Sequence, residues 1–154
     1  MLTLNRILFL VGLVSVSWSA TITDAATCSH PYDKKKLSYP SRQELCPNGT
    51  RFVDYLTGKS MPCEDAHVDH VIPTKIMYDL GVCGTRLEQF SNDKDNLRLT
   101  FSKLNLEKSD KNPILYAARH GGDTQNKVND IITNMAKKYP EISIEKLRDD
   151  ASLG

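Results

Sequence analysis

Four cysteines constrain this chain more than any other feature of its sequence. They stand at positions 28, 46, 63 and 83, and none belongs to a Cys-x-x-Cys pair. A zinc knuckle is therefore not expected. In an oxidising compartment, four cysteines predict two disulfide bonds, for which three pairings exist. We favour the sequential pairing, Cys28–Cys46 with Cys63–Cys83, because it closes the shortest loops; in a reducing compartment the four residues would be buried free thiols.

The N-terminus indicates export. Residues 7–18 are almost entirely apolar and follow a single positive charge at Arg6. A run of about 12 apolar residues is short for a membrane span and suits the core of a signal peptide. Small residues permit cleavage after Ser19 or after Ala25. We expect residues 1–25 to be a signal peptide and the mature protein to be secreted or periplasmic without a membrane attachment; an uncleaved N-terminal anchor is the alternative.

The composition predicts one globular domain behind this leader. The chain has 154 residues and a formal net charge of +1, which excludes a globally basic nucleic-acid binder. Residues 26–49 form a polar, turn-rich N-terminal extension, and its run 34–36 of lysines is expected to be solvated surface rather than a binding site. Residues 50–113 carry the distinctive motifs. Residues 114–154 form a C-terminal helical part of the same domain.

Local patterns assign secondary structure to these parts. Residues 51–56 favour a strand, and a turn signal at 57–60 predicts a hairpin. The further expectations are an extended segment over 65–72, a helix over 74–80, a strand over 96–100 and a helix over 102–109 with Ser102 as its N-cap.

The C-terminal part shows a helical stripe of apolar residues. Val128, Ile131, Ile132 and Met135 recur at helical spacing, and Pro140 ends the pattern. A further short helix is expected over 142–150. The stripe is most simply core that packs against the central part.

Five polar residues of the central part form a constellation. Asp69 and His70 close one predicted strand, Asn96 opens the next, and Asn105 and Lys108 share a face of the following helix. Strand alternation puts Asp69 and His70 on opposite faces, so they converge only at a bulge or a strand end. Each residue alone has an ordinary structural explanation, such as a hydrogen-bonded histidine or a turn asparagine. Their order and types together indicate a functional site.

The strings HVDHVIP and DNLRLTFSKLNLEKSDKNP resemble the HNH endonucleases, a group of the ββα-metal (His-Me finger) nucleases. The resemblance runs from about Phe52 to Pro113. It implies an α+β fold with a ββα-metal core and flanking helices, with disulfides in place of the structural zinc that many members bind. The stretch between the histidine and the central asparagine is long for the family. The resemblance also implies roles: metal ligands Asp69 and Asn105, general base His70, bracing residue Asn96, and basic residue Lys108.

Elementary chemistry agrees with these roles. A neutral histidine with a pKa of about 6.5 can accept a proton from water. A divalent ion can stabilise the charge on the phosphate and on the leaving oxygen. Asp69 and Asn105 both offer oxygen, which favours Mg²⁺, with Mn²⁺ possible and Zn²⁺ less suited. His67 as a third ligand would favour softer metals, but strand alternation alone favours a polar residue near the substrate.

A local basic patch suggests the substrate. Between residues 94 and 119, six basic residues stand against three acidic ones, a balance of +3. Such a patch binds phosphates without reading sequence. The candidate nucleic-acid contacts are Lys94, Arg98, Lys103 and Lys111.

The sequence therefore predicts an exported, Mg²⁺-dependent HNH endonuclease. It would hydrolyse phosphodiester bonds in nucleic acid, with DNA favoured and with low sequence specificity. An inhibitor protein or delayed activation would protect its host, and the sequence names no candidate for either. The alternative is a non-catalytic, secreted, disulfide-stabilised binding module on an HNH-like scaffold.

Overall fold

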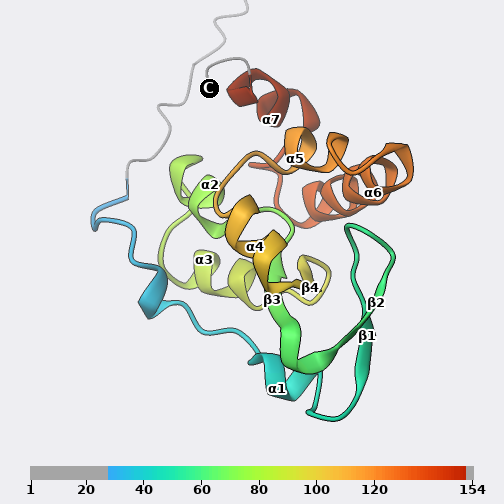
Figure 1. The fold of residues 1–154 in the computed structure, drawn as a ribbon. Helices are drawn as coiled ribbons and strands as arrows, with labels where there is room; N and C mark the ends of the chain where they lie inside the picture. Colours follow the sequence, from blue (N-terminus) through green and yellow to red (C-terminus); the bar gives the residue numbers. More distant parts are fainter. Residues whose placement is uncertain (1–27, 152–154) are drawn as a thin grey trace, which may run out of the picture.

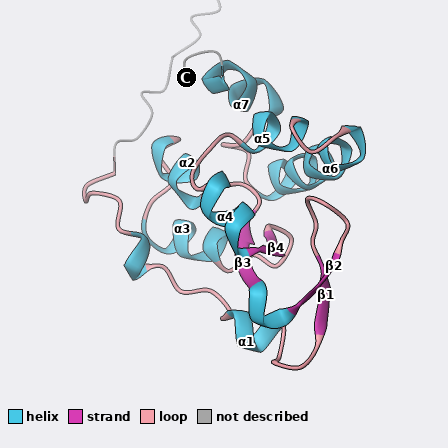
Figure 2. Cartoon of the chain, in the orientation of Figure 1, coloured by secondary structure: helices cyan, strands magenta, loops and turns pink. Residues whose placement is uncertain are grey.

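The computed structural model describes residues 28–151, so the predicted signal peptide lies outside the described residues. The fold is mixed α and β, with two antiparallel two-stranded sheets among helices (Figures 1 and 2). This confirms the expected α+β class. Within residues 28–151, none of the helices is both long and apolar enough to cross a bilayer.

The chain begins with a largely extended segment that we call the N-terminal strap (residues 28–46). It contains the 3-10 turn η1 (Lys34–Lys36) and the single helical turn α1 (Arg42–Leu45). Ser41 and Glu44 cap α1 reciprocally, each side chain accepting from the other residue's backbone N–H. The three lysines of η1 are exposed, as the sequence predicts.

A hairpin follows the strap. Strand β1 (Arg51–Val53) pairs with β2 (Ser60–Pro62), with Phe52 opposite Met61. Phe52 is buried in a small core with Cys46, Cys63 and Ala66. The predicted hairpin is present, but β1 ends at Val53 and not at residue 56, and β2 begins at Ser60, inside the predicted turn. Its buried face supports the start of the next strand.

A strand pair and a helix form the centre of the molecule. The 3-10 turn η2 (Cys63–Asp65) leads into β3 (Ala66–His70), which pairs antiparallel with β4 (Leu97–Phe101). Helix α4 (Ser102–Lys108) follows β4 directly and packs against both strands. The expected order of strand, strand and helix is confirmed. The N-cap is Phe101 and not the predicted Ser102, because the extended backbone ends one residue earlier and Ser102 is already helical.

Two helices fill the long connection between β3 and β4. Helix α2 (Thr74–Asp79) confirms the helix expected from 74 to 80. Helix α3 (Gly84–Ser91) was not predicted. Its buried apolar side chains are Leu87 and Phe90, which are too few to give a clear helical period in the sequence.

The disulfides join Cys28 to Cys83 and Cys46 to Cys63, so the sequential pairing that we favoured is wrong. The hairpin explains the second bond: the Cys63 N–H donates to the Thr50 carbonyl at 3.0 Å, which brings the end of β2 beside the chain that leaves the strap. Cys28 then meets Cys83 at the start of α3. The prediction from loop length is wrong because loop length changes the entropy of loop closure only slightly. The fold decides which cysteines come close enough to form a bond.

The C-terminal part is helical, as expected. Helices α5 (Pro113–Ala118), α6 (Gly122–Lys138) and α7 (Ile144–Ala151) pack together in the upper part of Figure 1. The predicted stripe lies inward, with Val128, Ile132 and Met135 buried and Ile131 partly buried. These residues share the main core with side chains of α2 and α3 such as Met77 and Phe90. The core thus holds the end of β3 against the helices.

Asp54 joins the hairpin turn to β4. Its fully buried carboxylate accepts hydrogen bonds from the backbone and hydroxyl of Thr57, at 2.7 and 2.8 Å, and from the Thr100 hydroxyl and the Phe101 N–H, both at 2.7 Å. Burial raises the pKa of Asp54, but the four hydrogen bonds together outweigh burial and leave the pKa below its ordinary value. The fold therefore stabilises the charged form.

We expect Asp54→Asn to lower the free energy of unfolding by about 2–3 kcal/mol at neutral pH. The NH₂ group of asparagine would face N–H and O–H donors and could not accept their hydrogen bonds. The stability that Asp54 contributes is present above the carboxyl pKa of the unfolded chain and is lost as the pH falls through the lower pKa of the fold. The variant should therefore approach the wild type below about pH 4. Urea unfolding of the oxidised proteins at neutral and acid pH measures this difference.

The exposed residue Asp130 supplies the control. Asp130→Asn should change the stability little at either pH, since that carboxyl lies on the solvent side of α6. Equal stability of Asp54→Asn and the wild type at neutral pH would show that the four hydrogen bonds contribute nothing.

Candidate active site

A cavity of about 480 Å³ lies beside β3. Strand β3 supplies four consecutive residues to its wall, from His67 to His70, and α4 supplies Asn105. The strap supplies the other wall with Lys34, Tyr39, Ser41 and Arg42. Asp69 and His70 both line the cavity, and His70 is the last residue of β3. The cavity therefore combines the predicted site with a segment that the prediction left out.

Asp69 is held by two neighbours. It is 4% exposed, and its Oδ1 accepts from the Lys108 ammonium at 2.9 Å. Its Oδ2 accepts from the Tyr55 hydroxyl at 2.6 Å. Lys108, 1% exposed, also donates to the carbonyl of His70 at 2.8 Å. A buried carboxylate needs such partners, and this one is fixed in orientation by groups from the hairpin and from α4.

His70 has a defined tautomer in its neutral form. Its Nε2 lies 2.8 Å from the Ser91 carbonyl, which can only accept, so Nε2 carries the proton and Nδ1 holds a lone pair. The edge of the Tyr39 ring packs against the imidazole, with the ring centroids 4.8 Å apart. Burial lowers the pKa of His70 below its ordinary value, against the opposing effect of the hydrogen bond to Ser91. His70 is thus a neutral base at physiological pH, with one nitrogen available to accept a proton.

Asn96 braces the chain just after His70. Its side-chain oxygen accepts from the Ile72 N–H at 2.8 Å, and its side-chain nitrogen donates to the Ile72 carbonyl at 2.9 Å. Its backbone carbonyl accepts from the Val71 N–H at 2.9 Å. Asn96 is fully buried, so these bonds satisfy both ends of its amide. Its effect on the orientation of the His70 ring stays a prediction.

The predicted metal ligands share the cavity. Asn105 donates from Nδ2 to the Val68 carbonyl at 3.5 Å, which leaves its Oδ1 as a free acceptor. Among residues 28–151, no cluster of three or more His, Cys, Asp and Glu side chains has the arrangement of a metal site. A metal here would therefore depend on Asp69 and Asn105, with His67 and Asp110 also lining the cavity.

The ligand atoms of Asp69 and Asn105 are of the chemical type that Mg²⁺ prefers. Both side chains offer oxygen, and each oxygen of Asp69 keeps a lone-pair direction beyond the bonds to Tyr55 and Lys108. The ammonium of Lys108 offsets the charge of Asp69, which weakens the attraction for a free cation. Mg²⁺ commonly binds through one or two carboxylates together with substrate phosphates. Binding jointly with a phosphate suits this pair better than binding alone.

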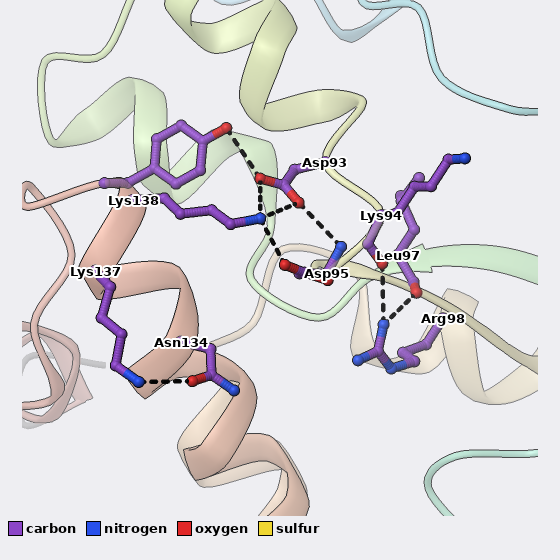
Figure 3. Close-up of polar contacts among 9 residues, drawn as sticks. Asp93, Lys94, Asp95, Leu97, Arg98, Asn134, Lys137 and Lys138 are labelled. Carbon is purple, nitrogen blue, oxygen red and sulfur yellow. Dashed lines mark hydrogen bonds and ion pairs between the residues drawn. The ribbon is translucent and has the colours of Figure 1, made fainter.

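The predicted nucleic-acid contacts lie away from this cavity. Lys94 and Arg98 lie together near the start of β4, where the guanidinium of Arg98 donates to the Lys94 and Leu97 carbonyls at 3.1 and 2.7 Å (Figure 3). Arg98 lines a separate hollow of about 290 Å³ with residues of α6. There, Lys138 pairs with Asp93 and Asp95 at 3.1 and 2.5 Å. Lys103 and Lys111 are exposed, and none of the four predicted contacts lines the cavity.

Three residues of the site, Tyr39, Tyr55 and Ser91, are not among the predicted ones. Tyr55 and Tyr39 contact Asp69 and His70 from segments 14 and more residues away, and no local pattern signals such contacts. The Ser91 carbonyl is a backbone group of a helix that was not predicted. The sequence signal for Tyr55, a tyrosine within the predicted strand 51–56, is weak.

Comparison of the chain with models of known protein families, with curated proteins and with solved structures finds no match.

Proposed function

We propose that the protein is a metal-dependent phosphodiesterase of the HNH type that cleaves nucleic acid. One observation carries this proposal: Asp69, His70 and Asn105 line one cavity, and the hydrogen bond to Ser91 leaves His70 Nδ1 free to act as a base. The order of β3, β4 and α4 is the order expected of a ββα-metal core. A buried base beside an oriented carboxylate is the arrangement that activation of a water molecule requires.

Each residue of the site has a separate role in the proposed hydrolysis. His70 accepts a proton from the attacking water at Nδ1, while the Ser91 carbonyl holds the proton on Nε2. Asp69 and Asn105 would hold the Mg²⁺ ion, which when bound supplies charge stabilisation for the phosphate and the leaving oxygen. Tyr55 and Lys108 fix Asp69 in position, and Asn96 fixes the turn behind His70. Each group is thus supported by a residue from another element.

Export fits the proposal. Both disulfides of the described chain are of the kind that persists in oxidising compartments. We propose a secreted or periplasmic protein whose substrate is extracellular or incoming nucleic acid, with DNA favoured. Cationic side chains that contact phosphates carry no base information, so we expect low sequence specificity.

Metal dependence tests the function. The oxidised mature protein should cleave plasmid DNA in Mg²⁺ or Mn²⁺ and should not cleave it in EDTA. Asn105→Ala should raise the Mg²⁺ concentration needed for half-maximal cleavage by at least about tenfold, because a metal-supporting contact is lost. Asn126→Ala is the matched control, since Asn126 is exposed on α6. Gel analysis over a metal titration gives both values.

One experimental result would contradict the proposed function. If the folded, oxidised protein cleaves neither DNA nor RNA in Mg²⁺, Mn²⁺ or Zn²⁺, the phosphodiesterase proposal is wrong. The non-catalytic binding module then becomes the better account of the same cavity.

A further inference from the structure

We infer that the N-terminal strap holds the substrate, and that Lys34 and Arg42 bind phosphates of the nucleic-acid backbone beside the bond that is cut. This inference rests on the proposed function and adds a second wall to its site. The sequence pattern predicts that the run 34–36 is solvated surface and that the phosphate contacts lie elsewhere. The geometry points to the strap, because the cavity lies between it and β3.

The strap is fixed against the body of the molecule at both ends and along its length. The disulfides Cys28–Cys83 and Cys46–Cys63 bond its two ends to other segments. Between them, the Tyr78 hydroxyl donates to the His30 carbonyl at 2.6 Å, and the Ser91 hydroxyl donates to the Ser38 carbonyl at 3.3 Å. The Tyr32 and Thr74 hydroxyls lie 2.6 Å apart. A wall held in this way is preorganised, so little ordering is required when substrate binds.

The strap's positive groups reach the same cavity as the proposed catalytic residues. Lys34 and Arg42 line it together with Asp69, His70 and Asn105. The contact of Tyr39 with the His70 ring fixes how the strap passes the base.

These two cations are free to bind an anion. Neither forms an ion pair with any residue of the described chain. Arg42 donates from one nitrogen to Asn48 Oδ1 at 2.5 Å and to the Cys46 carbonyl at 3.4 Å, which orients the guanidinium and leaves its other N–H groups available. On the acidic side, Asp69 is already paired with Lys108, and Asp110 is the remaining carboxylate of the lining.

The arrangement suits a chain of phosphates better than a single anion. A phosphate at the metal site would be followed along the strand by others spaced several ångströms away, and the strap offers a lysine and an arginine on that side. Arginine binds phosphate through its planar fork, and lysine binds it as a point charge. Contacts of this kind position the backbone without reading sequence.

Four single variants test the strap. Lys34→Ala and Arg42→Ala should each raise the KM for a DNA substrate by about three- to tenfold and change kcat by less than about twofold. Each should also reduce the slope of log(1/KM) against log salt by about 1, as loss of one phosphate contact does. Lys35→Ala, in the same turn but outside the cavity lining, is the control and should leave both quantities unchanged. Arg42→Lys retains the charge and should fall between the wild type and Arg42→Ala.

The outcomes separate this inference from the proposed function. If the wild type cuts DNA and the variants Lys34→Ala and Arg42→Ala match Lys35→Ala in KM and salt slope, the strap does not bind substrate. If the wild type cuts nothing, the proposed function fails, and anisotropy of a fluorescein-labelled DNA duplex in EDTA still tests the strap. Weaker binding by Lys34→Ala and Arg42→Ala than by Lys35→Ala would then support it, and equal binding would overturn it.

Discussion

Replacement of His70 by alanine should lower the rate of DNA cleavage by at least about 10²- to 10⁴-fold, the contribution expected of a general base. The lost group is the imidazole whose Nε2 donates to the Ser91 carbonyl and whose Nδ1 is the proposed proton acceptor. The loss should appear in kcat, since His70 acts on water and not on the binding of the phosphate backbone. Single-turnover cleavage of a labelled duplex in Mg²⁺ measures it.

Two further variants make the result specific. His70→Gln can donate to the Ser91 carbonyl but has no basic nitrogen, so it should be as inactive as His70→Ala while disturbing the fold less. His30→Ala removes an exposed histidine and should cleave as the wild type does. Cleavage within about tenfold of the wild type by both His70 variants would exclude the role of this residue as the base.

The strand pair and the helix after it could be predicted because their information is local. Alternating apolar residues mark β4, and the residues of β3 end at a proline turn, so their identity follows from short windows of sequence. Helix α3 and the strap could not be predicted in this way. The position of α3 depends on Phe90, which packs in the main core with residues far away in the sequence. The position of the strap depends on the disulfides from Cys28 and Cys46 to later segments of the chain.

The candidate site also combines residues that could be predicted from local sequence with residues that could not. Asp69, His70 and Asn105 could be named from motif spacing, since β3 and α4 carry them to one cavity wherever those two elements pack together. Of the residues that hold them, Lys108 and Asn96 belong to the motif, and the others come from outside it. Tyr55 reaches Asp69 from the hairpin, and Tyr39 reaches His70 from the strap. The motif therefore predicts the cavity-lining residues of β3 and α4 better than it predicts the residues around them.

Removal of the ammonium beside Asp69 should strongly destabilise the fold. We expect Lys108→Met to lower the free energy of unfolding by about 3–5 kcal/mol, because it leaves a buried carboxylate without its partner. The His70 carbonyl loses its hydrogen bond at the same time. Denaturant unfolding of the oxidised protein measures the loss. The exposed pair Lys75–Asp79 gives the matched control, and Lys75→Met should cost less than about 1 kcal/mol.

Two additional measurements identify the cause of this loss. Asp69→Asn introduced into Lys108→Met should recover part of the stability, because the uncompensated charge disappears while the Tyr55 hydroxyl keeps an acceptor. Millimolar Mg²⁺ should stabilise Lys108→Met more than the wild type, since a bound cation adds stability by mass action and here replaces the missing charge beside Asp69. No gain from Mg²⁺ in Lys108→Met would mean that Asp69 does not hold a metal in the absence of substrate. An additive double variant would mean that Lys108 acts mainly by packing its carbon chain.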